Sequence, residues 1–192
     1  NTDGTRDTSF SQGGTGYSGT VIDIALQSDG KIVSGGTFLG YNGSVNKYYI
    51  NRLETTANDD SFGLNGFSFN SGVVIRSIAV QNDGKILIGG EFLQHNGINI
   101  QRIIRLNNDA TGTRDTNFLS GNGFDNDVKI IRLQQDGKIL IGGYFTSYNG
   151  TTVNRIIRLN GTSTLANEEF EKNKINIYPN PVKEIIYLSN IT

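Results

Sequence analysis

The sequence predicts an all-β fold built from propeller blades, and three observations lead to this prediction. A segment of about 53 residues is written three times, and a period of this length marks a solenoid, a propeller or a tandem array. Within each copy, hydrophobic residues alternate with mixed ones on either side of tight-turn signals, which is typical of short half-buried strands. No helical periodicity interrupts them. The copies contain SDGKIVSGGTFLGYNG, NDGKILIGGEFLQHNG and QDGKILIGGYFTSYNG.

The first expected strand of each copy ends at an Asp-Gly pair. The third and fifth positions before the aspartate are always apolar, which predicts a strand with one buried face. Asp-Gly then predicts a tight turn, because glycine tolerates positive φ and aspartate can bond its own backbone. The aspartates are Asp29, Asp83 and Asp136.

A pair of glycines lies in the second expected strand. Glycine weakens a strand, so a glycine pair at this position indicates a bulge or a close approach of two backbones. We expect the pairs to let neighbouring sheets approach and the phenylalanine two residues later to fill the space between them. The pairs are Gly35–Gly36, Gly89–Gly90 and Gly142–Gly143, and the phenylalanines are Phe38, Phe92 and Phe145.

The third expected strand ends in Arg-Leu, and a shorter Asp-x-x-Phe element follows as a fourth. A recurring arginine beside a buried leucine suggests a structural ion pair, with the recurring aspartate as its partner, rather than a ring of anion-binding groups. The arginines are Arg52, Arg105 and Arg158, and the aspartates are Asp7, Asp59 and Asp115. Four short strands per repeat favour a propeller blade over a parallel β-helix, whose coils are shorter and lack the hairpin.

With these motifs in place, residues 1–160 resemble the delta-60 repeat family, whose pattern is close to DGKI, two hydrophobic residues, Gly-Gly-x-Phe, Asn-Gly and a final Arg-Leu element. The resemblance implies a β-propeller of an extracellular bacterial protein. Propellers close with about four to eight blades, whereas three full repeats are present. We therefore expect residues 1–160 to be the C-terminal part of a longer array, cut from a longer protein.

After residue 160 the repeat stops. Residues 161–173 are polar and are interpreted as a linker, and residues 174–192 as the first hairpin of a separate β-domain, with two prolines at its turn. This segment resembles the start of the type A C-terminal sorting domain of type IX secretion, against an unrelated proline-rich hairpin as the alternative. The matching residues are Ile177, Tyr178, Pro179, Asn180, Pro181 and Val182.

Composition narrows the classes of function. The formal net charge is −1 and the 17 basic residues are scattered, so we expect no nucleic-acid partner. The sequence has no cysteine, which excludes disulfides and thiolate metal sites. No apolar run approaches the ~18 residues of a transmembrane helix. We expect no cofactor and no metal site.

The candidate ligand-binding residues form a flat ring and an amide at the same place in each copy, directly before a glycine. They would stack on a sugar and hydrogen-bond to it if the rings are exposed along one rim; alternatively the rings pack beneath Asn-Gly turns. These residues are Tyr41 and Asn42, His95 and Asn96, and Tyr148 and Asn149. Two acidic stretches, Asp3 to Asp7 and Asp125 to Asp127, either bind calcium or cap turns.

The sequence therefore favours a non-enzymatic module for binding or adhesion, exported as type IX secretion cargo to the medium or the cell surface of a gram-negative bacterium. Its expected partners are the outer-membrane β-barrel proteins of that pathway and a surface glycan or protein ligand. The alternative is a carbohydrate-active enzyme whose catalytic residues lie outside residues 1–192. His95 is the single histidine, so no Ser-His-Asp or histidine-rich metal site can form within the chain.

Overall fold

The structure is a computed structural model. It describes residues 3–10, 14–45, 47–59, 62, 67–68, 72–118 and 121–161, all of which belong to the first of the two units of the chain, residues 1–162. The sorting segment expected at 174–192, and all but the first residue of the linker expected at 161–173, lie outside the described residues.

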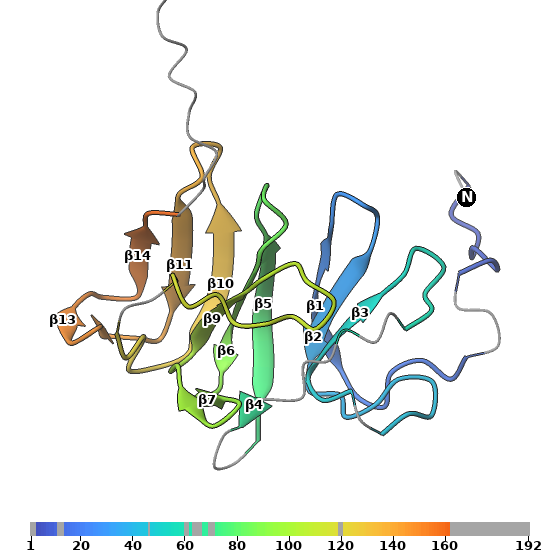
Figure 1. Ribbon diagram of the computed structural model, residues 1–192, viewed down its shortest axis with the longest axis horizontal. Coiled ribbons are helices and arrows are strands. Elements are labelled where there is room, and N and C mark those ends of the chain that lie inside the picture. Colours follow the sequence, from blue (N-terminus) through green and yellow to red (C-terminus); the bar gives the residue numbers. More distant parts are fainter. Residues whose placement is uncertain are drawn as a thin grey trace, which may run out of the picture. The chain divides into compact units, whose positions relative to one another are not determined.

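Three antiparallel sheets follow one another in chain order, from right to left in Figure 1. No helix occurs among the residues just given. The first sheet contains β1 (Val21–Leu26), β2 (Ile32–Gly36) and β3 (Ile50–Leu53). The second contains β5 (Val74–Val80), β6 (Ile86–Glu91) and β9 (Ile103–Leu106). The third contains β10 (Val128–Leu133), β11 (Ile139–Gly143) and β14 (Ile156–Leu159).

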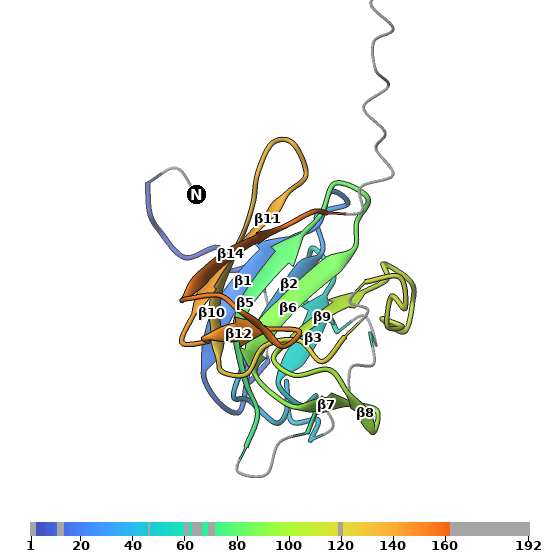
Figure 2. The same ribbon diagram turned by 90° about the vertical axis from the view of Figure 1, so that its left-hand side faces the viewer.

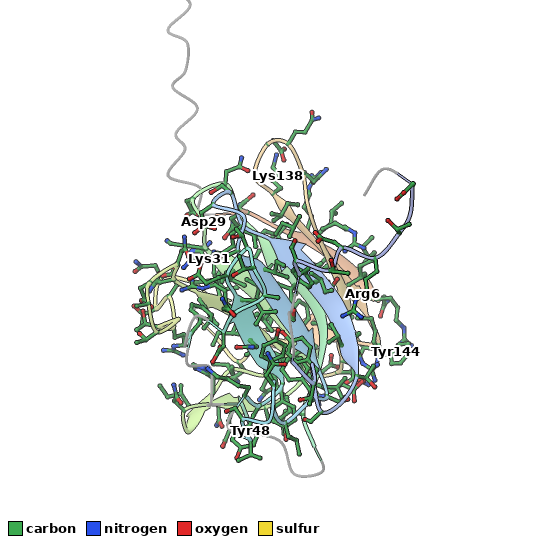
Figure 3. All side chains as sticks on the ribbon, turned by 90° about the vertical axis from the view of Figure 1, so that its right-hand side faces the viewer. Arg6, Asp29, Lys31, Tyr48, Lys138 and Tyr144 are labelled. Atoms are coloured by element: carbon green, nitrogen blue, oxygen red, sulfur yellow. The ribbon has the colours of Figure 1, made fainter. Side chains whose placement is uncertain are left out.

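Two of the copies contain a short hairpin between their second and third strands. In the second copy, β4 (Phe67–Ser68), β7 (Gln94–His95) and β8 (Ile98–Asn99) form a small sheet. In the third, β12 (Ser147–Tyr148) pairs with β13 (Thr151–Thr152). Because the strands are antiparallel, these hairpins lie at the end of each sheet opposite the Asp-Gly turns. Figure 3 shows Asp29, Lys31 and Lys138 at one end and Tyr48 at the other.

The sheets pack face to face, and their first strands lie nearest to one another, since β5 contacts both β1 and β10. One core cluster joins the first two sheets, bringing Val33 and Ile50 together with Ile75 and Ile78. A second joins the second and third sheets in the same way, bringing Ile103 together with Val128 and Ile131. These sheets are propeller blades, and the predicted all-β fold is confirmed.

The two glycines of each pair are required by different close contacts. In the first two blades, a Cβ on the first glycine would meet the next blade: at Gly89 it would lie 2.5 Å from Cγ1 of Val128 and 3.0 Å from Cδ1 of Ile131. A Cβ on the second glycine would collide with a backbone carbonyl of its own blade, at the β-bulge that begins the first strand. The close approach predicted from the sequence therefore exists, and each pair also contains a bulge contact. The colliding carbonyls are those of Thr20, Val74 and Asp127, opposite Gly36, Gly90 and Gly143.

The fourth strand that the sequence predicts for each blade is not formed in the described part of the chain. Each of the three blade sheets has three strands in the described part of the chain. The Asp-x-x-Phe element forms no ladder with the third strand but an isolated bridge, Leu53 with Asp59 and Leu106 with Arg114, and in the second copy the amide of Asp115 also donates to the carbonyl of Arg105 at 2.9 Å. In the second copy, side-chain bonds fold this segment into turns: Asp109 accepts the amide of Thr111 at 3.0 Å, and Asp115 accepts that of Asn117 at 2.9 Å. A strand cannot continue through such turns, because the aspartates bond their own backbone.

Candidate binding surface at the hairpin rim

Each Asn-Gly pair forms the tip of a tight hairpin that follows the second strand of its blade. Both central residues have positive φ, which defines the type I′ turn that joins two twisted strands. The φ values are 48° and 82° at Asn42 and Gly43, 51° and 74° at Asn96 and Gly97, and 49° and 78° at Asn149 and Gly150. We call the three hairpins (residues 41–45, 94–99 and 147–152) the hairpin rim.

The rings before these turns face inward. Tyr41 is 5 % exposed and its hydroxyl donates to the carbonyl of Ala57 at 2.6 Å. Its ring centroid lies 4.7 Å from that of Tyr17, and the half-buried ring of Tyr148 lies 4.8 Å from Phe124 in the same arrangement. His95 is also buried. The rings therefore pack beneath the turns and do not form the exposed stacking arc that the first sequence interpretation requires.

The asparagines are exposed, yet two of them also tie the hairpins to the preceding segment. Oδ1 of Asn42 accepts the amide of Gly16 at 2.9 Å, and Oδ1 of Asn149 accepts the amide of Gly123 at 2.8 Å. These bonds fix the hairpin on its blade, so the rim is a preformed surface.

His95 replaces the tyrosine of the other two copies, and the ordinary pKa of an imidazole is near 6.5. Burial, followed by the positive charge of Arg114, lowers the pKa of His95 to about 4. The imidazole is therefore neutral at neutral pH.

The recurring arginines are placed differently from blade to blade. In the second blade, Nη2 of Arg105 lies 2.8 Å from Oδ2 of Asp115, and both side chains are almost fully buried. Arg52 donates to Asn108 of the second blade at 3.1 Å and its guanidinium lies 4.0 Å above the ring of Phe62. Arg158 is exposed. The repeated arginine is thus a structural residue in the first two blades.

The family comparison agrees with this geometry. A family model described as "Domain of unknown function (DUF5122) beta-propeller" matches residues 27–55, 81–118 and 134–165, together just over half of the chain. The chain belongs to this family. The three matched segments each begin before an Asp-Gly turn and extend to or beyond the Arg-Leu strand, so the family repeat and the blades coincide. A search of the curated proteins finds no match.

The acidic stretches of this family member cap turns. The carboxylate of Asp125 accepts the hydroxyl of Thr146 at 2.6 Å and the amide of Ser147 at 2.9 Å, and these bonds lower its pKa to about 2. Asp3 and Asp7 each accept the amide two residues later. Within the ranges given above, no group of three or more histidine, aspartate or glutamate side chains is arranged to hold a metal ion, and no helix is long and apolar enough to span a membrane.

Sequence reasoning missed an aromatic residue before the first strand of each blade. The backbones of Tyr17 and Phe124 form isolated β-bridges with Tyr41 and Tyr148, and the backbone of Phe67 pairs with that of His95. Tyr17 also packs on Phe38, and Phe124 on Phe145, with ring centroids 4.3 and 4.4 Å apart. A glycine precedes each of the three, which is a usable signal. Their distance to the Asp-Gly pair differs in the second copy, which hid the repeat.

An interblade charge network was also missed. Oε1 of Glu91 accepts from Arg76 of its own blade at 2.6 Å and from Lys129 of the next blade at 2.8 Å. Lys129 also contacts Asp127, which pairs with Arg102 at 2.8 Å. This network links the second and third blades. The sequence offered no repeat signal for it, because the first copy has Ile22 and Thr37 at the positions of Arg76 and Glu91.

Proposed function

We propose that the chain is a non-enzymatic binding module that recognises a surface glycan or protein through the hairpin rim. The observation that supports this is the separation of roles within each blade. The repeated rings, glycines and most of the repeated arginines are used in packing, whereas the tips of the hairpins project amides and hydroxyls. The exposed rim residues are Asn42, Ser44, Val45, Asn96, Ile98, Asn99, Asn149, Thr151 and Thr152.

The rim combines two kinds of contact that a binding surface needs. Its asparagines and threonines offer hydrogen-bond donors and acceptors to a sugar or a peptide. Exposed aliphatic groups lie among them, with Val45 72 % and Ile98 48 % exposed. Because the turns are fixed by backbone geometry and by the Asn42 and Asn149 bonds, little ordering entropy would oppose binding.

Binding is tested by substituting the rim of the second blade, where polar and aliphatic groups are adjacent. Asn96→Ala with Ile98→Ala should weaken adhesion of the purified chain to the surface of the producing bacterium at least tenfold. The matched control is Ser28→Ala with Gln135→Ala, two exposed residues at the Asp-Gly end. Equal loss in both pairs, or no loss in the rim pair, would contradict a rim site.

We further propose that the protein reaches this surface as cargo of type IX secretion. The support is the match of residues 177–182 to the start of a type A sorting domain, following a propeller repeat. The outer-membrane β-barrel proteins of that pathway are then its export partners, and its location is the medium or the cell surface.

Export is tested in the complete protein expressed in a bacterium with this pathway. Pro179→Ala with Pro181→Ala should retain the protein in the periplasm, because the prolines shape the turn of the proposed signal. Protein in the medium, on the surface and in the periplasm would be quantified separately. Undiminished export after deletion of everything beyond Glu169 would rule out the sorting role.

A further inference from the structure

The segment that follows β9 contains an arginine without a counter-charge. Arg114 is half-buried, and its backbone forms a bridge with Leu106 at the end of β9. Among the described residues, no carboxylate and no hydrogen-bond acceptor pairs with its guanidinium. The neighbouring Asp115 is already occupied, because its Oδ2 lies 2.8 Å from Nη2 of Arg105 and 2.9 Å from Nζ of Lys85. The guanidinium of Arg114 can therefore take an anion from outside the chain.

A small cavity opens beside this arginine. It measures about 20 Å³, and its lining includes Asn99 of β8, Arg114, Phe118 and Gly121. Figure 2 shows β8 and the segment after β9 on the same side of the molecule. A cavity of this size holds about one water-sized group. It can seat one oxygen of a bound group, while the rest of the ligand lies on the surface above.

Both polar side chains on the open side of the cavity are hydrogen-bond donors. Nε2 of Gln94 donates to Oδ1 of Asn99 at 3.0 Å, which orients the Asn99 amide. The nitrogen of that amide has no acceptor in the described part of the chain, and the same holds for the guanidinium of Arg114. A ligand that brings acceptor oxygens would satisfy both groups.

The charges around the cavity also favour an anion. The lining residues and their ion-pair partner provide three cations, Lys85, Arg105 and Arg114, and one carboxylate, Asp115. The charge of Arg114 acts on its surroundings, since the pKa of the buried His95 is lowered by burial first and by Arg114 second. A surface with this excess of positive charge is complementary to an acidic ligand.

This place is also where the second blade departs from the repeat. The residue that corresponds to Arg114 in the first blade is Asn58, and the ring that corresponds to His95 is Tyr41. The hydroxyl of Tyr41 donates to the carbonyl of Ala57, next to Asn58, so this corner of the first blade is uncharged and closed by packing. Residues needed for the blade recur in each copy, whereas a cation introduced in one blade is available for a single ligand site.

We propose that the cavity beside Arg114 binds the carboxylate of an acidic sugar, with Arg114 as its counter-charge and the amide of Asn99 as a second donor. Because Asn99 belongs to the hairpin rim, this site rests on the rim function proposed above and gives its ligand class, a glycan that contains uronic acid. A uronic acid has ring and hydroxyl oxygens beside its carboxylate, so its acceptors match adjacent donors. An acidic peptide side chain carries its carboxylate on an apolar stem, which places no acceptor next to it.

The site is tested by titrating the purified chain with sodium glucuronate at constant ionic strength and following the histidine signals by NMR. His95 is the single histidine, so its ring protons report on the charge of Arg114 without overlap from other imidazoles. We expect saturable shifts of these signals. Arg114→Gln should weaken binding at least about tenfold, as for the loss of a charge-assisted hydrogen bond. Arg158→Gln removes the same charge from an exposed residue, and this matched control should bind like the wild type.

Two further ligands distinguish the chemistry of the site. Glucose, which lacks the acid, should give no saturable shift, and N-acetylglutamate should bind more weakly than glucuronate. Thermal unfolding checks the fold of Arg114→Gln, which should melt like the wild type because the guanidinium is unpaired among the described residues.

Absence of glucuronate binding, equal binding of glucose, or undiminished binding by Arg114→Gln would overturn the proposal. Tighter binding of N-acetylglutamate would also overturn it and assign the cavity to an acidic peptide. Adhesion to the bacterial surface is measured separately with the rim pair Asn96→Ala and Ile98→Ala. Failure of that test with intact glucuronate binding would refute the rim function alone, and the reverse result would refute the acidic-sugar site alone.

Discussion

The second and third blades contain the same tetrapeptide, Ile-Ile-Arg-Leu, in the same strand, yet the two strands have different surroundings. All four residues of β9 are buried, whereas β14 alternates between exposed and partly buried residues. The register with the neighbouring strand is the same in both, since Ile103 pairs with Gly89 and Ile156 with Gly142. The difference is that the third blade covers β9, whereas no residue in the described part of the chain covers β14. Burial in this molecule is thus a property of blade junctions and cannot be assigned to a repeat in isolation.

The largest contrast should be between the arginines of these two strands. Asp115→Ala removes the carboxylate that pairs with Arg105, leaving a buried guanidinium with a lost partner, and should lower the free energy of unfolding by about 3–5 kcal/mol. Arg158→Ala removes an exposed side chain and should change it by less than about 0.5 kcal/mol. Urea denaturation of both variants checks this. Similar losses would mean that the two strands are equally buried in solution.

The second contrast concerns the first glycine of each pair. Gly89→Val places methyl groups against Val128 and Ile131 and should cost roughly 1–3 kcal/mol through overpacking. The sequence pattern alone predicts the same damage at Gly142, but there a Cβ would meet Cγ2 of Ile130 at 2.9 Å and the carbonyl of Arg155 at 3.7 Å, both in its own blade. Gly142→Val should therefore cost clearly less than Gly89→Val. Thermal unfolding of the two variants checks the comparison, and equal losses would contradict it.

The third prediction is a dependence on pH that belongs to the second blade. Because burial lowers the pKa of His95 to about 4, the unfolded chain binds more protons than the folded chain between the ordinary value near 6.5 and about 4. The stability that this group contributes is complete above that range and is lost as the pH falls through it, by about 3 kcal/mol in total. His95→Tyr, which installs the residue of the other two copies, should remove this component. Unfolding would be followed at pH 7.5 and pH 4.5; an unchanged slope would contradict a buried neutral histidine.

The smallest effects should come from contacts that stay within one blade. Asn42→Ala and Asn149→Ala each remove one acceptor for a glycine amide, so each should cost about 1 kcal/mol. The two values should agree, although these blades have different neighbours. A large difference in melting temperature between the two variants would show that the hairpins are not independent of the blade junctions.

The sequence was sufficient for the strands and turns of this protein because their causes are local. Alternating residues before Asp29, Asp83 and Asp136 predicted the first strands, and the Asp-Gly pairs predicted the turns that follow them, since glycine tolerates positive φ. The glycine pairs predicted a close approach. The fourth strand was predicted wrongly, because side-chain bonds of Asp109 and Asp115 to nearby amides compete with strand pairing.

Only the tertiary structure decided which repeated residues are buried and which remain on the surface. Tyr41 and His95 were candidates for a sugar platform, and their rings lie under the turns because an aromatic residue from before the first strand packs against Tyr41 and a backbone from the same region pairs with His95. Gly89 and Gly142 both follow Lys-Ile-Leu-Ile, yet among the described residues Gly89 faces another blade and Gly142 does not. Local backbone geometry determines the strands of each repeat. The hydrophobic core between two blades also needs residues of the next repeat, about 53 positions away, so burial depends on how the blades pack together.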